Sequence, residues 1–148
     1  MTRPSEGEVI AHQLLDLYGS DPYREVYDAC EPHREAHGAG CGVYPAEASK
    51  MRVLATLVRS TGARSALEIG GGLGYSALWL AEALPDDGRL ETIDRSAEHA
   101  RLIDRYADQF GLGDRITAVR GEGSEVLGEL DGPYDVIYDD GWFGEQPS

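Results

Sequence analysis

Short apolar runs alternate with segments of helical periodicity from residue 65 to residue 138. The alternation predicts strands at 65–69, 89–94, 116–119 and 134–138, with helices at 75–84, after Ser96, and at 124–130. Strands and helices in strict alternation form a parallel sheet with right-handed crossovers. The sequence therefore predicts an α/β fold built around a parallel sheet.

The residues before this alternation read as helical. Apolar spacing predicts helices at 9–18, from Pro22 onward, and at about 46–60, with a glycine-rich break at 38–42. The predicted core face of the third helix consists of Met51, Leu54, Leu57 and Val58. Because residues 1–45 show no separate core, we expect them to form a helical cap on a domain spanning 46–148.

The helix after Ser96 has the clearest start and stop. Serine is a residue type that caps helix N-termini, and Gly111 suits the left-handed position just past a C-terminus. The apolar face between them is predicted to consist of Ala100, Ile103, Ala107 and Phe110.

The chain is acidic, with a net charge of -14 over 148 residues. Such a surface repels phosphate backbones and anionic lipids, which argues against nucleic acid and membrane partners. No apolar run approaches the roughly 18 residues of a membrane helix, and the N-terminus lacks the pattern of a secretory signal. With only Cys30 and Cys41, we expect a soluble cytoplasmic protein with free thiols.

A glycine-rich turn follows the first predicted strand and reads Glu68-x-Gly70-x-Gly72-x-Gly74. Glycines there allow a sharp turn and a close approach of the backbone to a ligand, and the next helix directs free N–H groups at the same place. A dinucleotide fingerprint would need a third glycine, and Tyr75 and Ala77 occupy the two positions where it would stand. The turn therefore predicts a cofactor site other than that of NAD.

Asp94 ends the second predicted strand. An acid at this place can accept both ribose hydroxyls of a nucleoside, whether that nucleoside belongs to NAD or to S-adenosylmethionine. The alternative is a strand-end acid that caps the helix beginning near Ser96.

These motifs resemble those of class I S-adenosylmethionine-dependent methyltransferases, whose first motif joins a strand-end acid to alternate glycines. Within that class, residues 46–143 resemble the small O-methyltransferase family that includes the catechol and caffeoyl-CoA enzymes. The residues that carry this resemblance are Leu67 to Gly70, Gly74-Tyr75-Ser76, Leu84-Pro85, Asp94, Gly121-Glu122-Gly123 and Tyr134 to Ile137. The resemblance implies a Rossmann-like methyltransferase fold that lacks its C-terminal strands.

The resemblance also implies roles for individual residues. Glu68, Gly70 and Gly72 would hold the methionine moiety, and Ser76 would meet its carboxylate. Asp94 would bind ribose, and Glu122 and Gly123 would line the adenine. The full set of expected cofactor-binding residues is Glu68, Gly70, Gly72, Gly74, Tyr75, Ser76, Asp94, Gly121, Glu122 and Gly123.

Asp140 matches the family aspartate that helps bind a divalent metal, but two departures surround it. Phe143 stands where the family has a lysine that activates the acceptor hydroxyl, and the chain reaches Ser148 before the strand that supplies two further metal ligands. We therefore assign no residue to a metal site and keep a divalent metal as a disfavoured alternative. Asp140 is assigned the role of orienting or deprotonating the acceptor. Four strands instead of seven suggest a fragment of a longer protein, or a homodimer that completes the sheet.

Weaker candidates lie elsewhere in the chain. Cys30, His33, His37 and Cys41 are residue types that bind zinc, but the C-x₂-C knuckle of structural sites is absent, which favours surface histidines and a half-buried cysteine. The other two histidines, His12 and His99, are expected to face solvent. The aromatic residues Trp142 and Phe143 either wall an acceptor pocket or pack against a missing half.

The sequence thus predicts an S-adenosylmethionine-dependent methyltransferase acting on an oxygen of a small molecule. The alternative is a chain that binds the cofactor without catalysing transfer. A nicotinamide-dependent oxidoreductase is disfavoured by Tyr75.

Overall fold

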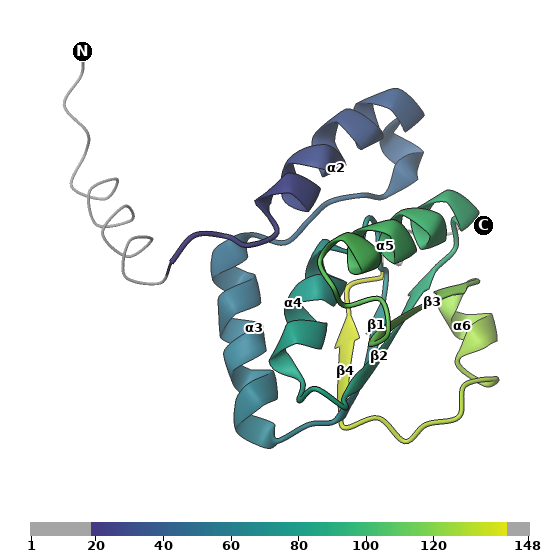
Figure 1. Ribbon diagram of the computed structural model, residues 1–148. Coiled ribbons are helices and arrows are strands. Elements are labelled where there is room, and N and C mark those ends of the chain that lie inside the picture. Colours follow the sequence, from purple (N-terminus) through teal and green to yellow (C-terminus); the bar gives the residue numbers. More distant parts are fainter. Residues whose placement is uncertain (1–18, 142–148) are drawn as a thin grey trace, which may run out of the picture.

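The computed structural model describes residues 19–141, in which four parallel strands form one sheet (Figure 1). The strands are β1 (Ser65–Ile69), β2 (Arg89–Asp94), β3 (Ile116–Arg120) and β4 (Val136–Asp139). Their order across the sheet is β3-β2-β1-β4, and Leu67 of β1 lies opposite Glu91 of β2 and Ile137 of β4. The parallel α/β sheet predicted from the alternation is confirmed.

Five α-helices and one 3₁₀ turn surround the sheet within the same residues. They are α2 (Arg24–His37), η1 (Ala39–Cys41), α3 (Ala48–Thr61), α4 (Tyr75–Ala83), α5 (Ala97–Gln109) and α6 (Gly123–Val126). The helix expected at 124–130 ends early, because the Glu129 N–H bonds to the Val126 carbonyl three residues back and turns the chain. The helix expected at 9–18, with His12, lies outside the described residues.

The helices divide between the two faces of the sheet. One face of the sheet packs against four helices, α2, α3, α4 and α5. The large apolar core between them includes Val26, Met51, Leu78, Leu90 and Ile103. A small second cluster of Leu67, Ile93 and Val126 joins α6 to the opposite face (Figure 1). The central strands are therefore covered on both faces, as parallel sheets require.

The core face of α3 differs from the prediction at one position. Met51 and Val58 are buried and Leu54 is partly buried, but Leu57 is 55% exposed and Ala55 takes its place in the core. At about 100° per residue, Leu57 lies about 120° around the helix from Met51, whereas Ala55 lies close to the line of Met51. The expectation for Leu57 was wrong because Leu57 lies outside the helix face on which Met51, Ala55 and Val58 are buried.

The predicted cap of α5 is confirmed, but its buried face differs from the prediction. Ile103 and Ala107 are buried as expected, whereas Ala100 and Phe110 are only partly buried, and His99 and Tyr106 are buried as well. The Ser96 hydroxyl accepts a hydrogen bond from the His99 N–H at 3.3 Å, and Gly111 adopts a φ of +72°. His99, expected to face solvent, is only 6% exposed. It is held inside because its Nδ1 lies 3.0 Å from a carboxylate oxygen of Asp94.

Within the part of the chain that the structure describes, no helix is both long enough and apolar enough to cross a membrane.

Candidate functional site

A pocket of about 370 Å³ opens at the carboxyl ends of the strands. The strands β1, β2 and β3 lie side by side in chain order, and β4 then pairs with the opposite edge of β1. Loops that leave adjacent strands in opposite directions separate at such a point, and open α/β sheets bind ligands in the resulting crevice. Pockets of this volume are in the range that holds small molecules and cofactors.

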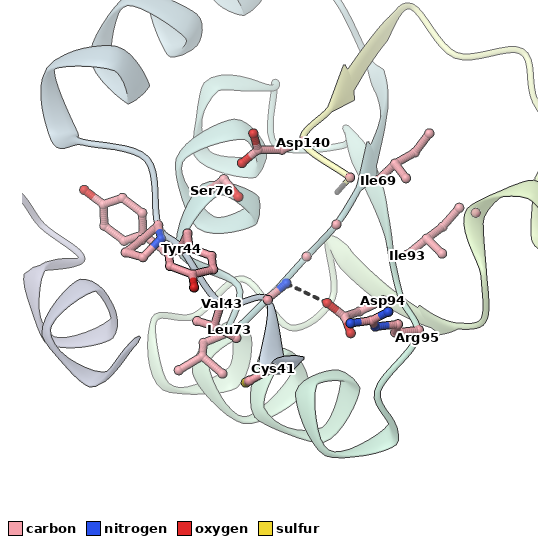
Figure 2. Close-up of a pocket in the computed structure, with 18 of the residues that line it drawn as sticks. Cys41, Val43, Tyr44, Ile69, Leu73, Ser76, Ile93, Asp94, Arg95 and Asp140 are labelled. Carbon is pink, nitrogen blue, oxygen red and sulfur yellow. Dashed lines mark hydrogen bonds between the residues drawn. The ribbon is translucent and has the colours of Figure 1, made fainter. Parts of the chain in front are cut away.

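The structure brings most of the predicted site residues together around this pocket. The loop after β1 and the start of α4 contribute Gly70, Gly72, Tyr75 and Ser76. The loops after the other strands contribute Asp94, Gly121, Glu122, Gly123 and Asp140. Asp140 and Ser76 lie toward one end of the pocket, and Asp94 with Arg95 toward the other (Figure 2). Glu68 and Gly74 are not among the lining residues.

Gly70 marks the closest approach between the loops that follow β1 and β4. Its φ is +92°, and a Cβ placed on it would lie 2.8 Å from the backbone oxygen of Asp140. A side chain there would therefore meet both an unfavourable backbone conformation and a neighbouring main chain. The glycine requirement predicted for the turn is strongest at this residue.

Asp94 is fixed by contacts to both of its carboxylate oxygens. Oδ2 accepts a hydrogen bond from the Gly72 N–H at 2.8 Å, which Figure 2 shows as a dashed line. Oδ1 accepts from the Ser96 N–H at 2.9 Å and contacts His99. The carboxylate thus contacts the N-terminal region of α5, as the capping alternative required, while also lining the pocket. Because each carboxylate oxygen can accept two hydrogen bonds, Oδ2 keeps capacity for a ligand hydroxyl.

Glu68 lies completely buried beneath the glycine-rich turn. The Ser76 hydroxyl donates to one of its oxygens and the Thr92 hydroxyl donates to the other, the latter at 2.6 Å. Burial raises the pKa of Glu68 to about 7, against the lowering effect of these two hydrogen bonds. The carboxyl group therefore ties β1 to β2 and α4, and its two oxygens face protein hydroxyls.

Tyr75 lines the pocket and anchors the first turn of α4 to the chain before α2. Its hydroxyl donates to Asp21 at 2.7 Å, and its ring packs edge-on against Tyr27 at 5.3 Å. Tyr75, which stands where a dinucleotide fingerprint requires glycine, therefore has a packing role of its own.

The wall of the pocket opposite the sheet was not predicted. It consists of the segment between α2 and α3, with Cys41, Val43, Tyr44 and Pro45 among its lining residues. The Val43 carbonyl accepts from Arg34 at 2.9 Å, and Arg95 donates to the Gly40 carbonyl at 2.9 Å. The glycines of the 38–42 break indicate a loop without indicating what it covers.

Asp140 follows β4, and its side chain is 37% exposed. One of its oxygens lies 4.0 Å from the Lys50 ammonium of α3, which also lies 5.6 Å from the centre of the Tyr138 ring. Among residues 19–141, Asp140 belongs to no group of three potential metal ligands whose atoms lie within 4.8 Å of one another. Trp142 and Phe143 lie outside the described residues.

Comparisons with known proteins agree with this geometry. A profile of the O-methyltransferase family matches residues 39–141. A protein of Mycobacterium sp. (strain JLS) is 35% identical over 98% of this chain and 64% of its own length. A catechol O-methyltransferase of Niastella koreensis is 31% identical over 90% of this chain and 60% of its own length. The chain spans about half to two thirds of the length of the curated relatives it matches.

Two solved structures show the same architecture. The O-methyltransferase TomG of Streptomyces achromogenes, in complex with S-adenosylmethionine, is 32% identical with a TM-score of 0.69, over 78% of this chain and 52% of that one. An O-methyltransferase of Bacillus cereus, in complex with S-adenosylhomocysteine, is 26% identical with a TM-score of 0.74, over 89% of this chain and 60% of that one. The matched family profile, the shared fold and the pocket at the strand ends lead to one conclusion. This chain belongs to the O-methyltransferase family.

Proposed function

We propose that the chain binds S-adenosylmethionine in the pocket at the strand ends and transfers its methyl group to a hydroxyl oxygen of a small molecule. The observation that carries this proposal is the joint placement of Gly70, Gly72, Ser76 and Asp94 around one pocket. Relatives of the same fold were solved with S-adenosylmethionine and S-adenosylhomocysteine.

The pocket offers a different kind of contact to each part of the cofactor. The N-terminus of α4, beginning at Tyr75, presents backbone N–H groups and a positive dipole end that suit the methionine carboxylate. Asp94 suits the ribose hydroxyls, because its Oδ2 can accept a second hydrogen bond. Gly121, Glu122 and Gly123 after β3 would line the adenine. Glu68, which is buried beneath the turn, would not touch the cofactor and would instead orient the Ser76 hydroxyl by accepting its hydrogen bond.

Methyl transfer is an in-line displacement at the sulfonium methyl group. The acceptor oxygen forms the new bond to carbon, the bond from carbon to sulfur breaks, and the sulfur keeps the electron pair as a neutral thioether. The acceptor proton must leave, and Asp140, which lines the pocket, would orient or accept it. The main contribution of the protein is to align the two reactants.

Binding without transfer is the alternative. The chain spans 48% to 64% of the length of two curated relatives. Incubation with methyl-labelled S-adenosylmethionine and a panel of catechols, phenols and aliphatic alcohols distinguishes methyl transfer from cofactor binding alone. We expect label on an acceptor oxygen. Cofactor binding without label on any acceptor would contradict the transfer and leave the alternative.

Replacing Asp94 with alanine should weaken cofactor binding by about 1–3 kcal/mol, or roughly 5- to 150-fold in Kd, through loss of hydrogen bonds to a charged group. Calorimetric titration with S-adenosylhomocysteine measures the change. Asp104 is exposed on α5, so Asp104→Ala removes the same charge without touching the pocket and serves as the control. Equal affinities in the two variants would mean that the ribose does not meet Asp94.

A further inference from the structure

Three potential metal ligands converge beside the pocket from three separate segments. His33 comes from α2, Cys41 from η1 and His99 from α5. The Nε2 atom of His99 lies 3.2 Å from Nε2 of His33 and 3.5 Å from Sγ of Cys41, and all three ligand atoms lie within 4.8 Å of one another. The sequence pattern had grouped Cys30 and His37 with His33 and Cys41, without His99.

The structure replaces Cys30 with His99 in this group. Cys30 is buried in the core, and its thiol donates to the Val26 carbonyl at 3.2 Å. His37 stacks on His33 at 4.2 Å and turns its Nε2 toward Glu98 at 3.3 Å. His33, His37 and Glu98 also bring three potential ligand atoms within 4.8 Å of one another, but His37 and Glu98 are more exposed than Cys41 and His99. The less exposed group is His33, Cys41 and His99.

Two of the three separations match the edges of a tetrahedral zinc site, and the third, between His33 and Cys41, lies within 4.8 Å. With zinc–nitrogen bonds of about 2.0–2.1 Å and zinc–sulfur bonds of about 2.3 Å, a tetrahedron places two nitrogens about 3.3 Å apart and a nitrogen and a sulfur about 3.6 Å apart. The distances from His99 to His33 and to Cys41 are 3.2 Å and 3.5 Å. An ion could enter this group with small movements of the side chains.

Asp94 determines which nitrogen of His99 faces the group. A carboxylate only accepts hydrogen bonds, so the Nδ1 of His99 that lies 3.0 Å from Asp94 carries the proton. The Nε2 of the neutral ring then directs a lone pair toward His33 and Cys41. A carboxylate behind a histidine in this way is the usual outer partner of a zinc-bound imidazole.

We propose that this group binds one zinc ion through His33 Nε2, Cys41 Sγ and His99 Nε2, with the fourth position left to water. Two imidazoles and a thiolate suit zinc and do not suit magnesium or calcium, which take oxygen ligands. The Cys41 thiol releases its proton to solvent as the zinc–sulfur bond forms. The ion would join α2, η1 and α5, and so fix the wall of the pocket that contains Cys41.

The test uses the whole chain, freed of metal by a chelator and then titrated with zinc or with cobalt(II). We expect one ion per chain by elemental analysis after desalting. We also expect cobalt to give the visible bands of a tetrahedral site together with a thiolate charge-transfer band in the near ultraviolet, both abolished by added zinc. Zinc should also raise the unfolding temperature, because the three ligands come together only in the folded chain, which therefore binds the ion more tightly than the unfolded chain does. Failure to bind one equivalent of zinc would overturn the proposal.

Paired variants identify the ligands. Cys41→Ser should abolish the charge-transfer band, and His33→Asn should weaken zinc binding by at least about tenfold. Cys30→Ala and His37→Asn are the matched controls, and both should keep the cobalt spectrum of the unmodified chain. Loss of the charge-transfer band in Cys30→Ala but not in Cys41→Ser would contradict the assignment. Circular dichroism of each variant without metal shows whether it folds.

Discussion

Replacing Glu68 with glutamine should remove a large part of the pH dependence of stability between about pH 4.5 and 7. The carboxyl is completely buried, and its pKa in the folded chain is raised to about 7 from an ordinary value near 4.5. Across that interval the folded chain keeps the proton and the unfolded chain has lost it. Unfolding therefore releases a proton, and stability falls as the pH rises.

The expected size of this effect follows from the shift. A difference of about 2.5 pKa units corresponds to about 3 kcal/mol, present in full below pH 4.5 and lost once the pH exceeds about 7. The Glu68→Gln side chain cannot titrate, so the unfolding free energy of the variant should vary less over the same range. Its amide can still accept one of the hydroxyl hydrogen bonds from Ser76 and Thr92.

Urea unfolding of both proteins at half-unit steps from pH 4.5 to 8 measures the difference. Glu31 is exposed on α2, so Glu31→Gln removes one carboxyl without removing a buried one and provides the control. Parallel stability curves for Glu68→Gln and the unmodified chain would show that Glu68 titrates as an ordinary carboxyl.

The second large effect is expected for Gly70→Ala. Its φ of +92° is unfavourable for alanine by about 1–2 kcal/mol, and the new Cβ would lie 2.8 Å from the Asp140 backbone oxygen. The segment after β4 must then move away from the turn after β1. We expect a loss of stability of about 2–4 kcal/mol and at least tenfold weaker cofactor binding, because both loops line the pocket.

Gly128→Ala is the matched control for this change. Gly128 has no positive φ, and a Cβ placed on it would have no neighbouring atom within 4 Å, so both stability and cofactor affinity should stay close to those of the unmodified chain. Denaturant unfolding and titration with S-adenosylhomocysteine report the two quantities separately. An unchanged affinity in Gly70→Ala would show that the approach of the two loops does not shape the site.

Local patterns in the sequence were sufficient to predict the parallel sheet and the residues that line one side of the pocket. The alternation of strands and helices predicted a parallel sheet, and the glycines after β1 with Asp94 after β2 marked the strand ends that meet at the pocket. These features depend on neighbouring residues and on a general rule for parallel sheets. They need no knowledge of how distant segments pack.

Features that depend on distant packing were missed. His99 was expected at the surface, because nothing local shows that Asp94 and His33 enclose its ring. The error at Leu57 is of a different kind, because helical periodicity itself places Ala55, and not Leu57, close to Met51 on the buried face of α3. The pocket wall around Val43 lacks any periodic pattern and is held by side chains from α2 and from the loop after β2.

Calorimetric titration of the purified chain with S-adenosylhomocysteine, and in parallel with NAD, tests whether the pocket at the strand ends is a methyltransferase cofactor site. We expect saturable binding of S-adenosylhomocysteine at one site per chain, lost or strongly weakened in Gly70→Ala, and no binding of NAD. Binding of NAD, or no binding of S-adenosylhomocysteine by a folded chain, would contradict the proposed cofactor site.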